Sequence, residues 1–112
     1  MIISRTPVRV SFCGGGTDLP AYYMDSENGG LVTSMALAKH IHVTVNKRFD
    51  SSVRVSYSKT EIVNDFEELE HELVREAMRI TGVTQSVEIT TIADIPSRGT
   101  GLGSSSALTV GL

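Results

Sequence analysis

Residues 65–81 carry the clearest helical pattern in the chain, because apolar side chains recur there every three or four residues. The predicted apolar stripe consists of Phe66, Leu69, Leu73, Ala77 and Ile80, widened by Val74 and Met78. Asp65, with Glu68 three residues later, is typical of a capping box, and Gly82 suits the end of a helix. The pattern therefore predicts one amphipathic helix, with the acidic residues 67, 68, 70 and 72 on its solvated side.

Other segments alternate between apolar and polar residues, as strands with one buried face do. Residues 41–46 and 53–57 both alternate and are separated by a polar turn, so they predict a β-hairpin. Residues 31–38 predict a further buried strand, and residues 87–93 predict the strand before the last glycine-rich segment. In a predicted strand over residues 2–13, Pro7 requires an edge position or a bulge.

The order of the predicted elements is strands, a helix, one more strand and a second helix that begins near Ser104. This order predicts an α+β fold, a mixed sheet with helices on one face. A chain of 112 residues is large enough for one such domain. No helix stop signal precedes Leu112, so we expect the sequence to be the front portion of a longer protein.

Glycine and serine dominate residues 94–107, which read Asp-Ile-Pro-Ser-Arg-Gly-Thr-Gly-Leu-Gly-Ser-Ser-Ser-Ala. A glycine-rich turn lets backbone N–H groups approach an anion, and a helix that begins there adds N–H donors and a positive dipole end. The three serine hydroxyls add hydrogen-bond capacity and an oxygen ligand for Mg²⁺. The segment predicts a phosphate-binding loop that is not a Walker A motif. The alternative interpretation is a flexible turn with an ordinary serine cap.

A second glycine-rich segment lies near the N-terminus, where residues 5–19 read Arg-Thr-Pro-Val-Arg-Val-Ser-Phe-Cys-Gly-Gly-Gly-Thr-Asp-Leu. With the later Gly-Leu-Gly-Ser-Ser-Ser-Ala, it makes the chain resemble the GHMP small-molecule kinases, which include galactokinase, homoserine kinase, mevalonate kinase and phosphomevalonate kinase. Within that family, Arg-Thr-Pro-x-Arg and Gly-Gly-Gly-Thr-Asp-Leu-Pro are similar to the branch that acts on D-glycero-D-manno-heptose 7-phosphate. The resemblance runs from the first residues to the last.

The resemblance implies a fold like the second domain of ribosomal protein S5, with residues 1–112 as a partial N-terminal, ATP-binding domain and the C-terminal domain absent. It implies ATP and Mg²⁺ as cofactors. Arg9 would be catalytic beside the transferred phosphoryl group, and Ser105 would bind Mg²⁺. The residues implied to bind ATP are Arg98, Gly99, Gly101, Leu102, Gly103, Ser104, Ser105 and Ser106. Those implied to bind the sugar are Gly14, Gly15, Gly16, Thr17 and Asp18.

Two features depart from the usual motifs of the family. Four residues rather than three separate Pro96 from Gly101, and Arg98 in the extra space would either reach a phosphate or remain a solvated loop residue. Three glycines replace the Gly-Glu-His of galactokinase-like members, which leaves room for a larger or phosphorylated sugar and suggests a backbone nest for an anion. The catalytic base and the acidic Mg²⁺ ligand would lie beyond Leu112, so the chain alone should be inactive.

Composition narrows the classes of partner. The net charge of −3 and the scattered basic residues argue against nucleic acid, and the apolar runs are too short to cross a membrane. Cys13, the one cysteine, is expected to be a small buried hydrophobe of a reducing compartment, which favours a cytoplasmic location. His40, His42 and His71 lack neighbours at metal-ligand spacing, so we expect them at the surface or lining a pocket.

The resemblance implies that the parent enzyme transfers the γ-phosphate of ATP to the anomeric hydroxyl of a heptose 7-phosphate. Within the enzyme class, the alternatives are a kinase of another sugar, such as fucose, and a mevalonate-type kinase. Outside it, the alternative is a non-catalytic, S5-like binding module, for example one for RNA, which the acidic balance disfavours. A further alternative is an inactive chain that is stable only as a homo-oligomer.

Overall fold

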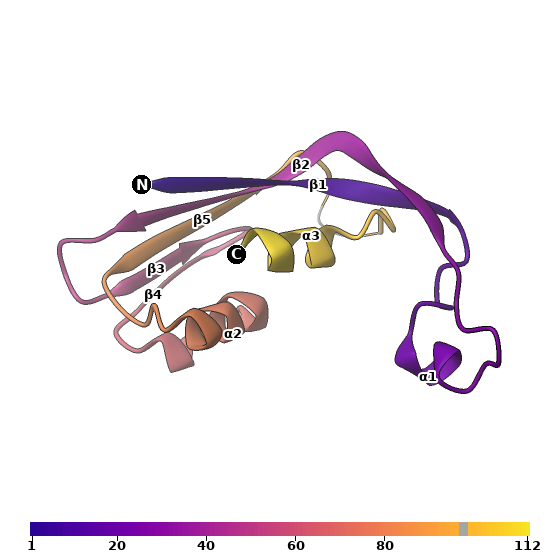
Figure 1. Cartoon of the computed structure of the whole chain (residues 1–112). Helices are drawn as coiled ribbons and strands as arrows, with labels where there is room; N and C mark the ends of the chain where they lie inside the picture. The colour runs from indigo at the N-terminus through magenta and orange to yellow at the C-terminus, as the bar shows by residue number, and fades with distance from the viewer. Residues whose placement is uncertain (97–98) are drawn as a thin grey trace.

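The computed structural model describes residues 1–96 and 99–112 as a five-stranded mixed sheet with helices on one face (Figure 1). The elements are β1 (Ile2–Cys13), α1 (Pro20–Tyr23), β2 (Thr33–Lys47), β3 (Val53–Ser56), β4 (Thr60–Val63), the 3₁₀ helix η1 (Phe66–Glu68), α2 (Glu72–Thr81), β5 (Val87–Ala93) and α3 (Ser104–Gly111). The strand order is β1-β2-β5-β3-β4, in which β3 and β5 are parallel and the other pairs antiparallel. The predicted fold class is confirmed.

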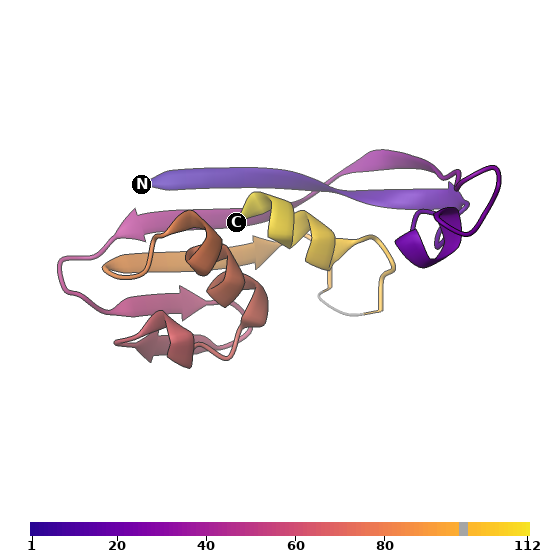
Figure 2. The ribbon, with the colours of Figure 1, turned by 60° about the horizontal axis from the view of Figure 1, so that its bottom comes forward.

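The core lies between the sheet and the helices α2 and α3, which cover the same face (Figure 2). Alternate residues of the strands point into it because successive side chains of a strand face opposite ways. The buried apolar residues are Val8, Ile41, Val43, Val53, Val55, Leu69, Val74, Met78, Val87, Ile89 and Ala107. The alternation predicted for the strands around residues 43 and 55 therefore identified the buried face.

The edge strand β1 is interrupted at Pro7, as its missing N–H predicts. The antiparallel register with β2 shifts between Pro7 and Arg9, so that Val8 opposes three residues of β2 instead of one. Val8 is fully buried, whereas Arg9 on the other side of the strand is exposed. Because this edge is irregular, the Arg9 N–H is free of the β1–β2 ladder and donates a hydrogen bond to Leu102 O at 3.1 Å.

The hairpin predicted from residues 41–46 and 53–57 is wrong, because β5 lies between the two strands. Within residues 41–47, β2 pairs with β5 as well as with β1, while β3 forms its hairpin with β4. Short-range alternation identifies strands but not their partners, since a parallel pairing such as β3 with β5 is made through a distant crossover. The strand β4 was missed altogether.

The long helix predicted over residues 65–81 is divided. Asp65 caps only the 3₁₀ helix η1, where its carboxylate accepts the Glu67 N–H at 3.1 Å. The chain then breaks before His71, which caps α2, and Gly82 ends α2 with a φ of +74° as expected. The break changes the phase of the apolar face, so Val74 and Met78 form its centre and Ile80 is 85% exposed.

Beyond the bulge, β1 and β2 continue as a two-stranded ribbon that carries α1 and the first glycine-rich loop at its far end (Figures 1 and 2). The strand predicted over residues 31–38 is present from Thr33 onward, but its predicted burial is wrong, since Leu31 is 83% exposed and most residues of this part of β2 are exposed. Cys13 is also exposed rather than buried, because it lies at the end of β1 in this ribbon.

Candidate functional site: a glycine-rich loop beside an apolar cavity

The second glycine-rich segment turns the chain from β5 into α3 through backbone conformations that favour glycine. Gly99, Gly101 and Gly103 have φ angles of +76°, +65° and +70°. A residue with a Cβ adopts these angles only at an energetic cost, so the spacing of the glycines matches the path of the loop. Leu102, between two of them, is partly buried against the core and anchors the loop.

The helix α3 begins directly after the loop, at Ser104. The first hydrogen bond of the helix runs from the Ala107 N–H to Gly103 O, at 2.9 Å. Among the described residues, no side chain caps this helix end. The preceding N–H groups of Ser104, Ser105 and Ser106 are therefore donors without an intrahelical acceptor, at the positive end of the helix dipole. A loop of glycines followed by such donors and three hydroxyls fits an anionic phosphate chain.

Arg9 joins the first glycine-rich motif to the second, which lies 92 residues further along the chain. Besides the backbone bond to Leu102, its guanidinium Nη1 donates to Gly101 O at 3.3 Å. The guanidinium also lies against Gly103, where a Cβ would come within 3.1 Å of Arg9 Cζ. An exposed cation is thus held beside the turn that leads into α3.

The far end of α3 is fixed on β1, which sets the direction in which the helix points. The Ser4 hydroxyl donates to Gly111 O at 2.6 Å. A Cβ at Gly111 would lie 3.0 Å from Thr6 Oγ1 and 3.1 Å from Ser4 Oγ, so glycine permits this close approach. The helix is therefore held on β1 at both ends, through Arg9 at the loop and through Ser4 at its last turn.

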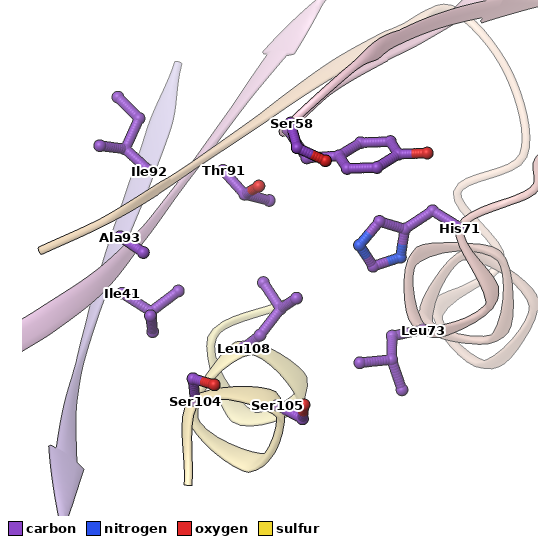
Figure 3. A pocket seen from close by; sticks show the side chains of 11 residues that line it. Ile41, Ser58, His71, Leu73, Thr91, Ile92, Ala93, Ser104, Ser105 and Leu108 are labelled. Atoms are coloured by element: carbon purple, nitrogen blue, oxygen red, sulfur yellow. The ribbon is translucent and has the colours of Figure 1, made fainter. Parts of the chain in front are cut away.

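An apolar cavity of about 400 Å³ opens beside the first turn of α3 (Figure 3). Its apolar walls come from Ile41, Leu73, Ile92, Ala93 and Leu108. Its polar groups come from Tyr57, Ser58, His71, Thr91, Ser104 and Ser105. A concave, mainly apolar space with few polar groups is typical of a site for a flat organic ligand. Ser104 and Ser105 therefore face both the cavity and the start of the helix.

The wall of the cavity opposite α3 is braced by a chain of polar contacts. The Tyr57 hydroxyl donates to Glu61 Oε2 at 2.9 Å, and Glu61 Oε1 accepts the Glu70 N–H at 2.8 Å. Burial, followed by the Glu61 carboxylate, raises the pKa of Tyr57. Burial opposes ionisation of Glu61, but hydrogen bonds from the Glu70 backbone and Tyr57 keep the pKa of Glu61 below its usual value.

The first glycine-rich loop is held by its own contacts. The Thr17 hydroxyl donates to Gly14 O at 2.7 Å and accepts the Leu31 N–H at 3.1 Å. Asp18 Oδ1 accepts the Gly16 N–H at 3.0 Å, and the Thr17 N–H donates to Gly14 O. The Gly16 and Thr17 N–H groups are therefore used within the loop itself.

The structure places the expected site residues in two groups. Arg9 lies with Gly99 and residues 101–106 at the start of α3, whereas residues 14–18 lie at the end of the ribbon, apart from α3 (Figures 1 and 2). Arg98 lies outside the described residues. Across residues 1–96 and 99–112, no three His, Cys, Asp or Glu side chains gather as a metal site. No helix in the same ranges is long and apolar enough to cross a membrane.

Sequence reasoning missed residues that the fold brings to the site. Tyr57 was read only as a strand residue, whereas His71 was expected at the surface or lining a pocket and does line the cavity. Asp94 was also missed: its Oδ2 accepts the His40 N–H at 2.9 Å, and its carboxylate lies 3.8 and 3.9 Å from Nδ1 of His40 and His42. The partners of Asp94 are far away in sequence, so only the β2–β5 pairing reveals them.

Among the known proteins with similar sequences or structures are kinases of small molecules. A D-glycero-alpha-D-manno-heptose 7-phosphate kinase of Campylobacter jejuni is 34% identical over 126 aligned positions, covering 99% of this chain and 35% of that protein. The chain thus spans about a third of the length of this curated relative.

Solved structures share the fold. A D-glycero-D-manno-heptose 1-phosphate kinase from Bacteroides thetaiotaomicron has a TM-score of 0.81 at 23% identity, over 99% of this chain and 39% of its own. The Methanococcus jannaschii mevalonate kinase has a TM-score of 0.70 at 16% identity, over 98% of this chain and 37% of its own. These two likenesses concern the fold alone.

No protein-family model matches the sequence. The likeness to the heptose kinase extends over nearly the whole chain, and the structures of related kinases share its sheet and helices. Over the region that it spans, the chain is therefore similar to the front part of such kinases, in agreement with the resemblance of its two glycine-rich motifs to the GHMP kinase family.

Proposed function

We propose that the protein containing this chain is an ATP-dependent sugar kinase that phosphorylates the anomeric hydroxyl of a heptose 7-phosphate. The curated relative that is 34% identical acts, by its name, on heptose 7-phosphate, and supports this substrate class. The reaction needs a phosphate site, a cation near the transferred group and a sugar site. Each has a candidate among the described residues.

The nucleotide would lie across the start of α3. Its phosphates would accept hydrogen bonds from the N–H groups and hydroxyls of residues 104–106, with Gly99, Gly101, Leu102 and Gly103 forming the turn around them. The base would enter the apolar cavity, which Ser104 and Ser105 border on the side of the helix. One ligand would thus occupy two adjacent features, a donor-rich helix end and an apolar space.

Arg9 would steady the phosphoryl group during transfer. Its guanidinium is exposed and held beside the loop by Gly101 O, so it can offset negative charge without rearrangement of the loop. Ser105 would supply a hydroxyl ligand to Mg²⁺, which offsets phosphate charge when bound. Arg98 would add a further cation at the phosphates.

The sugar would bind at residues 14–18. Asp18 would accept hydrogen bonds from sugar hydroxyls through its second carboxylate oxygen, since Oδ1 already accepts the Gly16 N–H. The absence of side chains at Gly14, Gly15 and Gly16 would leave room for a seven-carbon sugar. The proposal also includes a cytoplasmic location. It further includes the association of copies of the chain, and light scattering would test this association.

The contact of Arg9 with the second glycine-rich loop carries this proposal, because it holds a cation of the first motif beside the proposed phosphate site. The test is ADP release by the protein as expressed from its own gene, with heptose 7-phosphate compared with heptose, fucose and mevalonate. We expect release only with the phosphorylated heptose, and a loss of roughly 10²-fold or more in kcat for Arg9→Ala. ADP release that is independent of the sugar would contradict it.

A further inference from the structure

We propose that His71 recognises the base of the bound nucleotide by donating a hydrogen bond from Nε2 to an acceptor on the edge of the base. This inference rests on the proposed use of ATP. It assigns to one side chain of the cavity a role in nucleotide specificity, beside its role in the local structure as the cap of α2.

The capping role of His71 determines which ring nitrogen carries a proton. Nδ1 accepts the Val74 N–H at 3.5 Å, so this nitrogen has no proton of its own. A neutral imidazole then carries its single proton on Nε2, which is a donor. Figure 3 shows the ring of His71 turned toward the cavity, with one nitrogen on the cavity side.

The ring is held in this orientation by its neighbours. The Tyr57 ring meets it edge to face, with 4.6 Å between the ring centroids. Tyr57 is itself fixed by its hydrogen bond to Glu61. Because the donor is already oriented, binding a partner requires little loss of side-chain freedom.

The position of the donor suits the edge of a nucleobase. The cavity is apolar between Leu73 on α2 and Leu108 on α3, so a flat ring fits between aliphatic side chains. The other side of the cavity reaches Ser104 and Ser105, where the phosphates would bind. A base with its sugar and phosphates toward α3 would present ring nitrogens to the His71 side, and these nitrogens are acceptors.

Two substitutions separate the capping role of His71 from the proposed one, because asparagine and glutamine each reproduce one ring nitrogen. In His71→Asn, the amide oxygen takes the place of Nδ1 and retains the cap, but no atom replaces Nε2. In His71→Gln, the terminal NH₂ reaches the place of Nε2, while the acceptor for Val74 N–H is lost. The measurements are ATP affinity by calorimetry and the melting temperature of each variant, with inorganic triphosphate as a ligand that has no base.

We expect His71→Asn to melt like the wild type but to bind ATP about five- to tenfold more weakly, the loss expected for one hydrogen bond. His71→Gln should melt earlier and keep ATP affinity within about twofold of wild type. Triphosphate affinity should be the same in all three proteins. Equal ATP affinity of His71→Asn and wild type would overturn the role of His71, whereas a wild type that binds neither ATP nor triphosphate would overturn the proposed function itself.

Discussion

The Arg9 guanidinium packs against Gly103, so that a Cβ at residue 103 would lie 3.1 Å from Arg9 Cζ and 3.3 Å from both terminal nitrogens. Glycine suits this position for two reasons: its φ is +70°, and a Cβ would require the tip of the Arg9 side chain to shift. The first reason concerns the backbone alone. The second connects the β1 motif with the loop before α3.

Gly103→Ala should therefore affect both stability and nucleotide binding. The left-handed backbone should cost about 1–2 kcal/mol in the free energy of unfolding, and displacement of Arg9 should lower ATP affinity as well. Gly82→Ala is the matched control, because φ is +74° there and a Cβ would meet no atom within 4 Å. Urea unfolding and ATP titration of both variants would check this. ATP affinity that is unchanged in Gly103→Ala would show that the position of Arg9 does not matter for binding.

Gly15→Glu should abolish sugar binding while the fold is retained. Gly15 is the one glycine of its loop whose φ is not positive, and a Cβ there would meet no atom within 4 Å. The added carboxylate would occupy the proposed sugar site and repel a phosphorylated substrate. Sugar titration and thermal melting, with Gly15→Ala as the small-side-chain control, would measure both effects. Retained sugar affinity in Gly15→Glu would move the sugar site elsewhere.

The sequence could predict the elements of the fold better than their pairing. Period-two alternation located Val43 and Val55 on the buried face, and the helix stop at Gly82 was recognisable from glycine alone. The hairpin was wrong because alternation says nothing about which strand lies beside which. The phase of α2 was wrong because the break before His71 depends on tertiary contacts, such as the Glu61 side chain accepting the Glu70 N–H.

The glycine-rich turn into α3 could be predicted because its requirements are local, namely glycines at positive φ followed by a helix start. The cavity could not, because its walls come from β2, β5, α2, α3 and the segment after β3, which meet only in the folded chain. His71 carries no local signal of a ligand site for the same reason. Its neighbour Tyr57 is 14 residues away in sequence.

Ser86→Gly should stabilise the protein. Ser86 is the one residue other than glycine with a positive φ among residues 1–96 and 99–112, at +58°. Relief of this conformation is worth about 1–2 kcal/mol, and the added freedom of the unfolded chain offsets about 0.5–1 kcal/mol of it. The backbone bond from Arg48 N–H to Ser86 O, at 2.8 Å, does not depend on the side chain. Urea unfolding should give a gain of roughly 0.5 kcal/mol, whereas the control Thr84→Gly should lose stability. A loss in Ser86→Gly would mean that the serine conformation is not strained.

Acid should weaken the fold partly through Asp50, whose pKa is lowered to about 2. The main cause is the hydrogen bond from Arg48 Nε to Asp50 Oδ1 at 3.1 Å, followed by the Ser52 hydroxyl at 2.6 Å. Because the folded pKa lies below the usual aspartate value of 3.8, the ionised carboxylate stabilises the fold above about pH 4. That contribution is lost as the pH falls toward 2.

The variant Asp50→Asn isolates this effect, because its amide oxygen can still accept the Ser52 N–H but does not titrate. We expect the free energy of unfolding of the wild type to fall more steeply than that of Asp50→Asn between pH 4 and pH 2, with the gap between the two proteins closing toward the lower value. Urea unfolding at a series of pH values measures both slopes, and at high salt the difference should shrink because Arg48 and Asp50 are partly exposed. Parallel slopes would mean that Arg48 does not favour the ionised form of Asp50 in the folded state.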